Sequence, residues 1–126
     1  MKEFKIFVHN KPGELARVTE ALANHAVNIK AIASEGANEK SFLRVVTTDA
    51  TTTERALKTA GFGFELHDTL DLELLDRPGE LAKIARRLAR QGVNVESIYI
   101  LGSRNGKTIL ALTVHDLEKA KAAIGN

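Results

Sequence analysis

Cysteine is absent from the 126 residues of this chain. Its absence excludes disulfides, thiolate zinc sites, iron–sulfur clusters and cysteine nucleophiles. It also fits a reducing cytoplasm, where we expect the protein to reside. Tryptophan is absent too, and tyrosine occurs only once. We therefore expect no aromatic surface of the kind that stacks RNA bases.

The chain also lacks an excess of charge of one sign. Its 18 Lys and Arg residues nearly balance its 16 Asp and Glu residues, for a formal net charge of +2. Nucleic-acid-binding domains usually carry a larger or more clustered positive excess. The apolar run within the first ten residues is too short for a signal peptide or a membrane span. We therefore expect neither nucleic acid nor a membrane as a partner.

Proline occurs only twice, and the two residues mark an internal repeat. Pro12 and Pro78 each begin the string Pro-Gly-Glu-Leu-Ala, at an offset of 66 residues. Extending this alignment pairs residues 10–36 with 76–102, where 11 of 27 positions are identical. Residues 41–47 then pair with 107–113 at the same offset, and residues 54–56 with 118–120 at an offset of 64. The chain is therefore a duplicated module, which we assign to residues 1–68 and 69–126.

Hydrophobic periodicity predicts the same order of elements in both copies. The predicted strands are 4–8, 29–34, 42–48 and 62–68 in the first copy, and 70–74, 95–101 and 108–114 in the second. A first helix is expected after each Pro-Gly pair, because proline is tolerated in the first helical turn. A second helix is expected after Thr51-x-x-Glu54, a capping-box pattern, and after Asp116, a good N-cap.

The element order β-α-β-β-α-β predicts an α+β fold of two ferredoxin-like modules side by side, the second lacking its final strand. Turns are predicted at 36–40 and at 103–107, where Asn105-Gly106 is a strong hairpin signal. Because a module near 60 residues buries little surface alone, we expect the copies to share one core and one extended sheet. The missing strand leaves an unpaired edge, so we also expect a homodimer or larger homo-oligomer.

The repeated string resembles a known family. The pattern Asn/Asp-x-Pro-Gly-x-Leu, followed after a helix by Gly/Ala-Val-Asn-Ile/Val, is similar to the ACT domain, and the similarity covers both copies. It implies a non-catalytic regulatory protein without a cofactor, which binds an amino acid between modules, where the Pro-Gly loop of one faces the second strand of another. Residues 92–102, GVNVESIYILG, also resemble the regulatory subunits of acetolactate synthase.

The chemistry of the loop favours a ligand carboxylate. A helix beginning after Pro12-Gly13 presents free backbone N–H groups near Glu14 and Leu15, together with the positive end of its dipole. Gly13 lets a ligand approach the backbone, and Asn10 offers both a donor and an acceptor. Asp76, which is acceptor-only when ionised, suits an α-ammonium better. With the positions that the resemblance adds, the predicted binding residues are Asn10, Pro12, Gly13, Glu14, Leu15, Asn28 and Ile29 in copy one, and Asp76, Pro78, Gly79, Glu80, Leu81, Asn94 and Val95 in copy two.

Several alternatives stay open at the level of sequence. Asn10 and Asp76 can instead cap their helices, and Asn28 and Asn94 can simply take the turn before a strand. The protein can also be a regulatory subunit of an amino-acid biosynthetic enzyme of acetolactate synthase type, a pure dimerisation module, or a nucleic-acid-binding ferredoxin-like protein.

Other signals do not indicate a site. The basic residues Lys83, Arg86, Arg87 and Arg90 share one helical face, which we interpret as solvated, because copy one has Arg17, Glu20 and Asn24 there. The four histidines show no metal-ligand spacing, and no nucleophile–base pattern is present. We therefore expect neither a metal site nor an enzyme.

Overall fold

The computed structural model describes residues 1–37 and 40–125. The chain divides into two compact units, Met1–His67 (unit 1) and Asp68–Asn126 (unit 2). Unit 1 contains β1 (Lys2–His9), α1 (Glu14–Asn24), β2 (Ile29–Ala37), β3 (Lys40–Thr47), α2 (Ala50–Thr59) and β4 (Phe64–Asp68), which ends at the boundary. Unit 2 contains β5 (Leu70–Leu75), α3 (Glu80–Arg90), β6 (Val95–Arg104), β7 (Lys107–Val114) and α4 (Leu117–Ile124).

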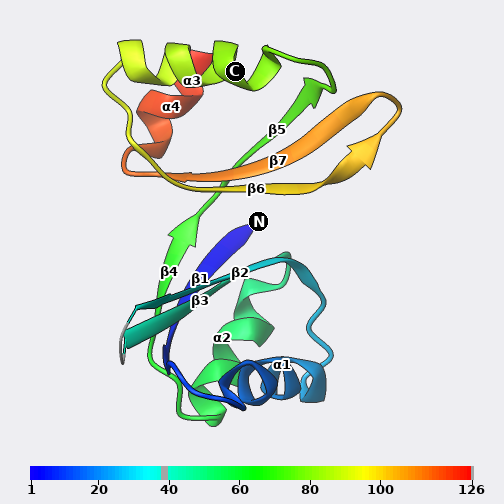
Figure 1. Ribbon diagram of the computed structural model, residues 1–126, viewed down its shortest axis with the longest axis vertical. Helices are drawn as coiled ribbons and strands as arrows, with labels where there is room; N and C mark the ends of the chain where they lie inside the picture. Colours follow the sequence, from blue (N-terminus) through cyan, green and yellow to red (C-terminus); the bar gives the residue numbers. More distant parts are fainter. Residues whose placement is uncertain (38–39, 126) are drawn as a thin grey trace. The chain divides into compact units, whose positions relative to one another are not determined.

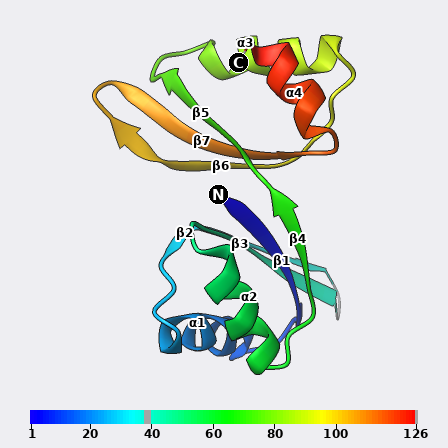
Figure 2. The same cartoon turned by 180° about the vertical axis from the view of Figure 1, so that it is seen from behind.

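Each unit is a sheet with two helices on one face (Figure 1, Figure 2). The strand order is β2-β3-β1-β4 in unit 1 and β5-β7-β6 in unit 2. The predicted α+β architecture of two βαββαβ-type modules, the second without a final strand among the described residues, is confirmed. The prediction of one extended sheet over a shared core is wrong, because the strands form two sheets and the buried side chains form two clusters.

Alternation along the strands explains why one face of each sheet is apolar. Phe4 and Ile6 of β1 point to the same side as Leu43 and Val45 of β3, and they pack against the apolar stripe of α1 and α2. In unit 2 the corresponding cluster is Leu70, Leu72, Ile84, Leu88, Val93, Leu110, Leu112 and Ala120. The same pattern thus builds both cores, each within its own unit.

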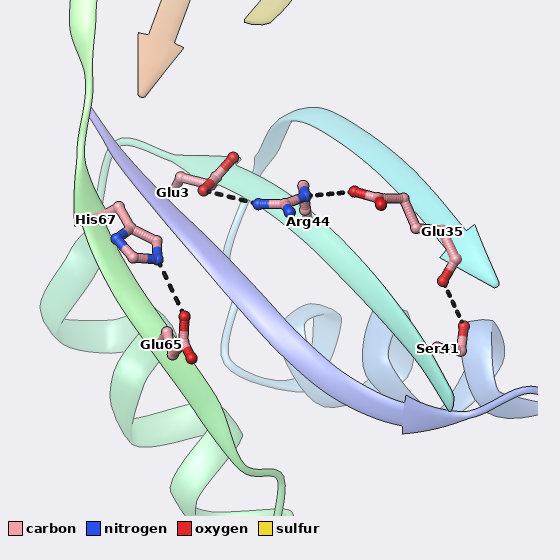
Figure 3. Close-up of polar contacts among 6 residues, drawn as sticks. All are labelled: Glu3, Glu35, Ser41, Arg44, Glu65 and His67. Atoms are coloured by element: carbon pink, nitrogen blue, oxygen red, sulfur yellow. Dashed lines mark hydrogen bonds and ion pairs between the residues drawn. The ribbon is translucent and has the colours of Figure 1, made fainter. Parts of the chain in front are cut away.

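A polar network crosses the other face of the unit 1 sheet (Figure 3). Arg44 of β3 lies 3.5 Å from the carboxylate of Glu3 in β1, and its Nε donates to Glu35 of β2 at 2.8 Å. The Arg44 guanidinium lowers the pKa of Glu35. Because the three side chains come from three neighbouring strands, these contacts favour the observed strand register over a slipped one.

The second helices begin earlier than the sequence pattern predicts. Asp49 is the N-cap of α2, and its side chain accepts a hydrogen bond from Thr52 N at 3.1 Å. The capping-box prediction at Thr51 is therefore wrong, because the threonine run lies inside the first turns of the helix. Asp116 caps α4 in the same way, accepting from Lys119 N at 3.0 Å, as predicted.

The hairpin at Asn105-Gly106 is also as predicted. Both residues have positive φ, 54° and 73°, as a tight turn between β6 and β7 requires. The corresponding turn predicted at 36–40 includes residues 38 and 39, which lie outside the described residues.

Candidate functional site

The two Pro-Gly loops have the same backbone geometry. Gly13 (φ 94°) and Gly79 (φ 89°) are left-handed and form the N-caps of α1 and α3. Asn10 and Asp76 are therefore not the helix caps, and Pro12 and Pro78 precede the helices rather than lie in their first turn. No atom of the described chain lies within 4 Å of a Cβ built at either glycine, so the backbone there is open to solvent. Glycine is needed here for its φ angle.

Glu14 closes the loop of unit 1 from inside. The residue is only 3% exposed, and its carboxylate accepts the backbone N–H of His9 at 2.9 Å. The same carboxylate lies 2.6 Å from Arg17 Nη1. The hydrogen bond from Arg17 is the main cause that lowers the pKa of Glu14, and the His9 N–H adds to it. This predicted ligand residue is thus engaged by its own chain.

Glu80, the counterpart in unit 2, turns toward different partners. Its carboxylate accepts from Arg77 Nε at 2.7 Å and from Lys83 Nζ at 3.2 Å, and these two hydrogen bonds lower its pKa. The end of β5 is held by another contact, because Asp76 N donates to the carbonyl of Gly106 at 2.9 Å. Identical Pro-Gly-Glu-Leu-Ala strings therefore build two loops with different electrostatics.

A pocket adjoins the loop of unit 2. Its volume is about 150 Å³, and it lies between the end of β5, the start of α3, and strands β6 and β7. The predicted residues Asp76, Glu80 and Leu81 line it, and the remaining lining is Leu74, Leu75, Arg77, Ile100, Thr108 and Leu110. The structure thus brings three predicted site residues together and adds an aliphatic wall.

The loop of unit 1 borders a pocket of different composition. This pocket of about 290 Å³ includes Glu14 but neither Asn10 nor Leu15, and its other walls are Phe7, Val8, His9, Arg17, Gly61, Phe62 and Gly63. The Arg17 guanidinium lies 4.7 Å from the centroid of the Phe62 ring. Since Arg17 also pairs with Glu14, the two charged side chains of this pocket already satisfy each other.

The remaining predicted residues fall at two ends of each sheet. Asn10 lies against Gly36 of β2, because a Cβ there would meet Asn10 Oδ1 at 3.1 Å. Asn28 precedes β2, whose first residue Ile29 pairs with Thr47, opposite Lys2. Seven residues of β1, roughly 24 Å at 3.4 Å each, separate Lys2 from His9. Asn10 and Asn28 therefore do not border one site within the unit.

The same separation holds in unit 2. Leu75 pairs with Lys107 at one end of β7, whereas Val95 pairs with Val114 at the other. The backbone of Asn94 is held there by His115, whose Nδ1 accepts from Asn94 N at 3.1 Å and whose N–H donates to the Asn94 carbonyl at 3.3 Å. These contacts support the structural interpretation of Asn94 as the residue that ends a turn.

An aromatic pair was not foreseen from the sequence. Phe7 of β1 and Phe42 of β3 pack edge to face, with ring centroids 5.5 Å apart, and Lys5 Nζ lies 4.2 Å from the centre of Phe42. They border a pocket of about 440 Å³ with His9, Lys40 and Ser41. The outward alternation Lys5, Phe7, His9 in the first strand was the available signal.

Two other features can be stated for residues 1–37 and 40–125. None of the helices there is long and apolar enough to cross a bilayer. Within the same ranges, no three His, Asp or Glu side chains converge in a way that would hold a metal ion. The basic residues Lys83, Arg86, Arg87 and Arg90 of α3 are all exposed.

Comparisons with known proteins identify the module. The family model described as an ACT domain pair matches residues 1–125. A structure of a Bacteroides thetaiotaomicron protein is similar at 28% identity and TM-score 0.87, covering 98% of this chain and 85% of that one.

Two regulatory subunits of aspartate kinase share the fold. The ligand-free subunit from Thermus thermophilus has 22% identity and TM-score 0.69, covering 97% of this chain and 85% of that one. The subunit from Thermus flavus has 23% identity and TM-score 0.66, covering 98% and 86%. No curated protein matches the chain in sequence, and the similarity to acetolactate synthase subunits is not confirmed.

Proposed function

This chain belongs to the ACT domain pair family, and from that premise we propose that it is a non-catalytic regulatory protein that binds an amino acid at its Pro-Gly loops. The observation that carries the proposal is the pocket beside the loop of unit 2. Asp76 and Arg77 place opposite charges at its edge, and aliphatic side chains form its wall. A zwitterionic head and an uncharged body match those two parts.

Regulation then follows from differential affinity. A ligand changes the behaviour of a protein only as far as it binds one conformation more tightly than another. An amino acid between the start of α3 and strand β6 would favour arrangements in which these elements keep their spacing. A partner that senses that arrangement would be controlled by the ligand.

A thermal-shift screen against the twenty amino acids tests the proposal. A ligand at 100 times its dissociation constant adds about 2.7 kcal/mol to stability. For a chain of this size that raises the melting midpoint by roughly 2–8 °C. A single-stranded nucleic acid included in the same screen should leave the midpoint unchanged. If no amino acid shifts the midpoint, the sensor function is wrong and a pure dimerisation module takes its place.

A second candidate function is a regulatory subunit of an amino-acid biosynthetic enzyme. The likeness to aspartate kinase regulatory subunits favours it, since those chains have the same paired fold. Co-purification with a purified aspartate kinase catalytic subunit, and separately with an acetolactate synthase catalytic subunit, distinguishes the partners. A stable complex with either one would support this candidate, and the amino acid found in the thermal screen should alter that enzyme's rate.

A further inference from the structure

We propose that the amino-acid site of this chain lies in unit 2 alone and takes a small amino acid with an aliphatic side chain. The inference rests on the proposed function and specifies its site and its class of ligand. Its starting point is the divergence of the two loops, whose glycines have the same geometry but whose glutamates bind different partners.

The first step is that unit 1 fills its own loop. The Glu14 carboxylate is nearly inaccessible and accepts from both His9 N and Arg17. A ligand carboxylate there would meet this negative charge with no unengaged arginine beside it, because Arg17 is shared between Glu14 and the Phe62 ring. Like charges at such short range oppose binding.

The second step is that unit 2 keeps donors available. Arg77 uses its Nε on Glu80, but a guanidinium has five N–H donors, so others can bind a carboxylate. Asp76 follows β5 directly and is exposed, with a side chain that accepts only. Arg77 and Asp76 are adjacent in the chain, so they offer the two charges that an α-amino acid head requires.

The third step concerns the ligand's side chain. Five of the residues around the pocket are aliphatic, namely Leu74, Leu75, Leu81, Ile100 and Leu110. Three of them are unusually open for their type, with exposures of 45% for Leu75, 42% for Leu81 and 71% for Ile100. Covering this surface is favourable for an apolar group and unfavourable for a polar one, whose hydrogen bonds to water would be lost.

The fourth step is that this wall is absent from unit 1. By strand register, Ile100 pairs with Leu110 and Leu110 with Leu72, as Ser34 pairs with Leu43 and Leu43 with Ile6. Ser34 therefore takes the place of Ile100, and His9 that of Leu75. The pocket volume of about 150 Å³ equals roughly five waters at 30 Å³ each, which limits the ligand to a small one.

Isothermal titration calorimetry on the full chain tests the inference. Valine, leucine and isoleucine should bind with one site per chain, and serine, aspartate and lysine should bind at least tenfold more weakly. Ile100→Ser, which installs the unit 1 residue, should weaken binding of the best aliphatic ligand about tenfold. Its mirror variant Ser34→Ile should not change the affinity. Both positions are exposed, and the unfolding midpoint of each variant checks that the fold is kept.

A second variant tests the charged edge. Asp76→Asn, which installs the residue found at position 10, should also weaken binding at least tenfold. The inference is overturned if a polar amino acid binds more tightly than every aliphatic one, if two sites per chain are titrated, or if Asn10→Ala abolishes binding while Asp76→Asn does not. Those outcomes leave the amino-acid sensor intact. Failure of all twenty amino acids to bind would instead overturn the proposed function itself.

Discussion

The carboxylate of Glu14 accepts a hydrogen bond from the backbone N–H of His9, with 2.9 Å between oxygen and nitrogen. Through this bond the first turn of α1 holds the end of β1, across the whole Pro-Gly loop. Arg17, one turn farther along α1, holds the same carboxylate at 2.6 Å. The loop of unit 1 is therefore a fixed corner, and this contact has no equivalent at Glu80, whose carboxylate accepts from Arg77 and Lys83.

Glu14→Ala should destabilise the protein more than Glu80→Ala. Removing Glu14 leaves a backbone N–H and a guanidinium without their acceptor in a mostly buried place, whereas Arg77 and Lys83 are exposed and return to water. We expect the melting midpoint to fall by several degrees for Glu14→Ala and by clearly less for Glu80→Ala. Equal shifts, measured by circular dichroism, would show that the His9–Glu14 bond is unimportant.

Stability should fall on acidification. Ion pairs or hydrogen bonds lower the pKa values of Glu14, Glu35, Asp49 and Glu80 in the folded chain. These carboxylates bind protons more weakly folded than unfolded, so their contribution is present above the unfolded pKa, about 4, and is lost as pH falls through the folded pKa. Urea titrations from pH 7 to pH 3 should show a plateau followed by a decline below about pH 4.5. A flat or rising profile below that pH would contradict the assigned contacts.

Gly13→Ala and Gly79→Ala should each destabilise the chain by about 1–2 kcal/mol, because a Cβ is disfavoured at their left-handed φ. Space is not the cause, since nothing lies within 4 Å of the added atom. Gly63→Ala is the matched control, because its Cβ would make an ordinary contact of 3.6 Å with Phe7 and its φ is not in the left-handed region. Urea denaturation should therefore separate the two loop variants from the control.

A homodimer or larger homo-oligomer remains our prediction for the chain in solution. In the described residues β5 pairs on one side only, with β7, and an open edge offers unpaired N–H and C=O groups to another strand. Light scattering at tens of micromolar should give at least twice the mass of one chain. A mass of 13.7 kDa at that concentration would refute the prediction.

Details of the duplication were predictable only in part. The notional offsets of 66 and 64 for the third strands and second helices are wrong. Leu43 and Leu110 pair with the equivalent residues Ile6 and Leu72, and Asp49 and Asp116 are the equivalent N-caps, so the offset there is 67. A bulge between Ile100 and Gly102 absorbs the extra residue of the second copy. Such a bulge changes no hydrophobic pattern strongly enough to be seen in the sequence.

The sequence by itself determined the duplication, the element order, the two Pro-Gly loops and the Asn105-Gly106 hairpin. These depend on local rules: period-2 and period-3.6 hydrophobicity, the φ angles that glycine permits, and the N-cap preference of Asp116. Only the tertiary structure decided that Glu14 turns inward to His9 while Glu80 turns outward to Arg77, and that Ile100 joins Leu81 at a pocket. The two glutamates stand in identical pentapeptides, so their difference comes from residues brought near by folding, which no local pattern encodes.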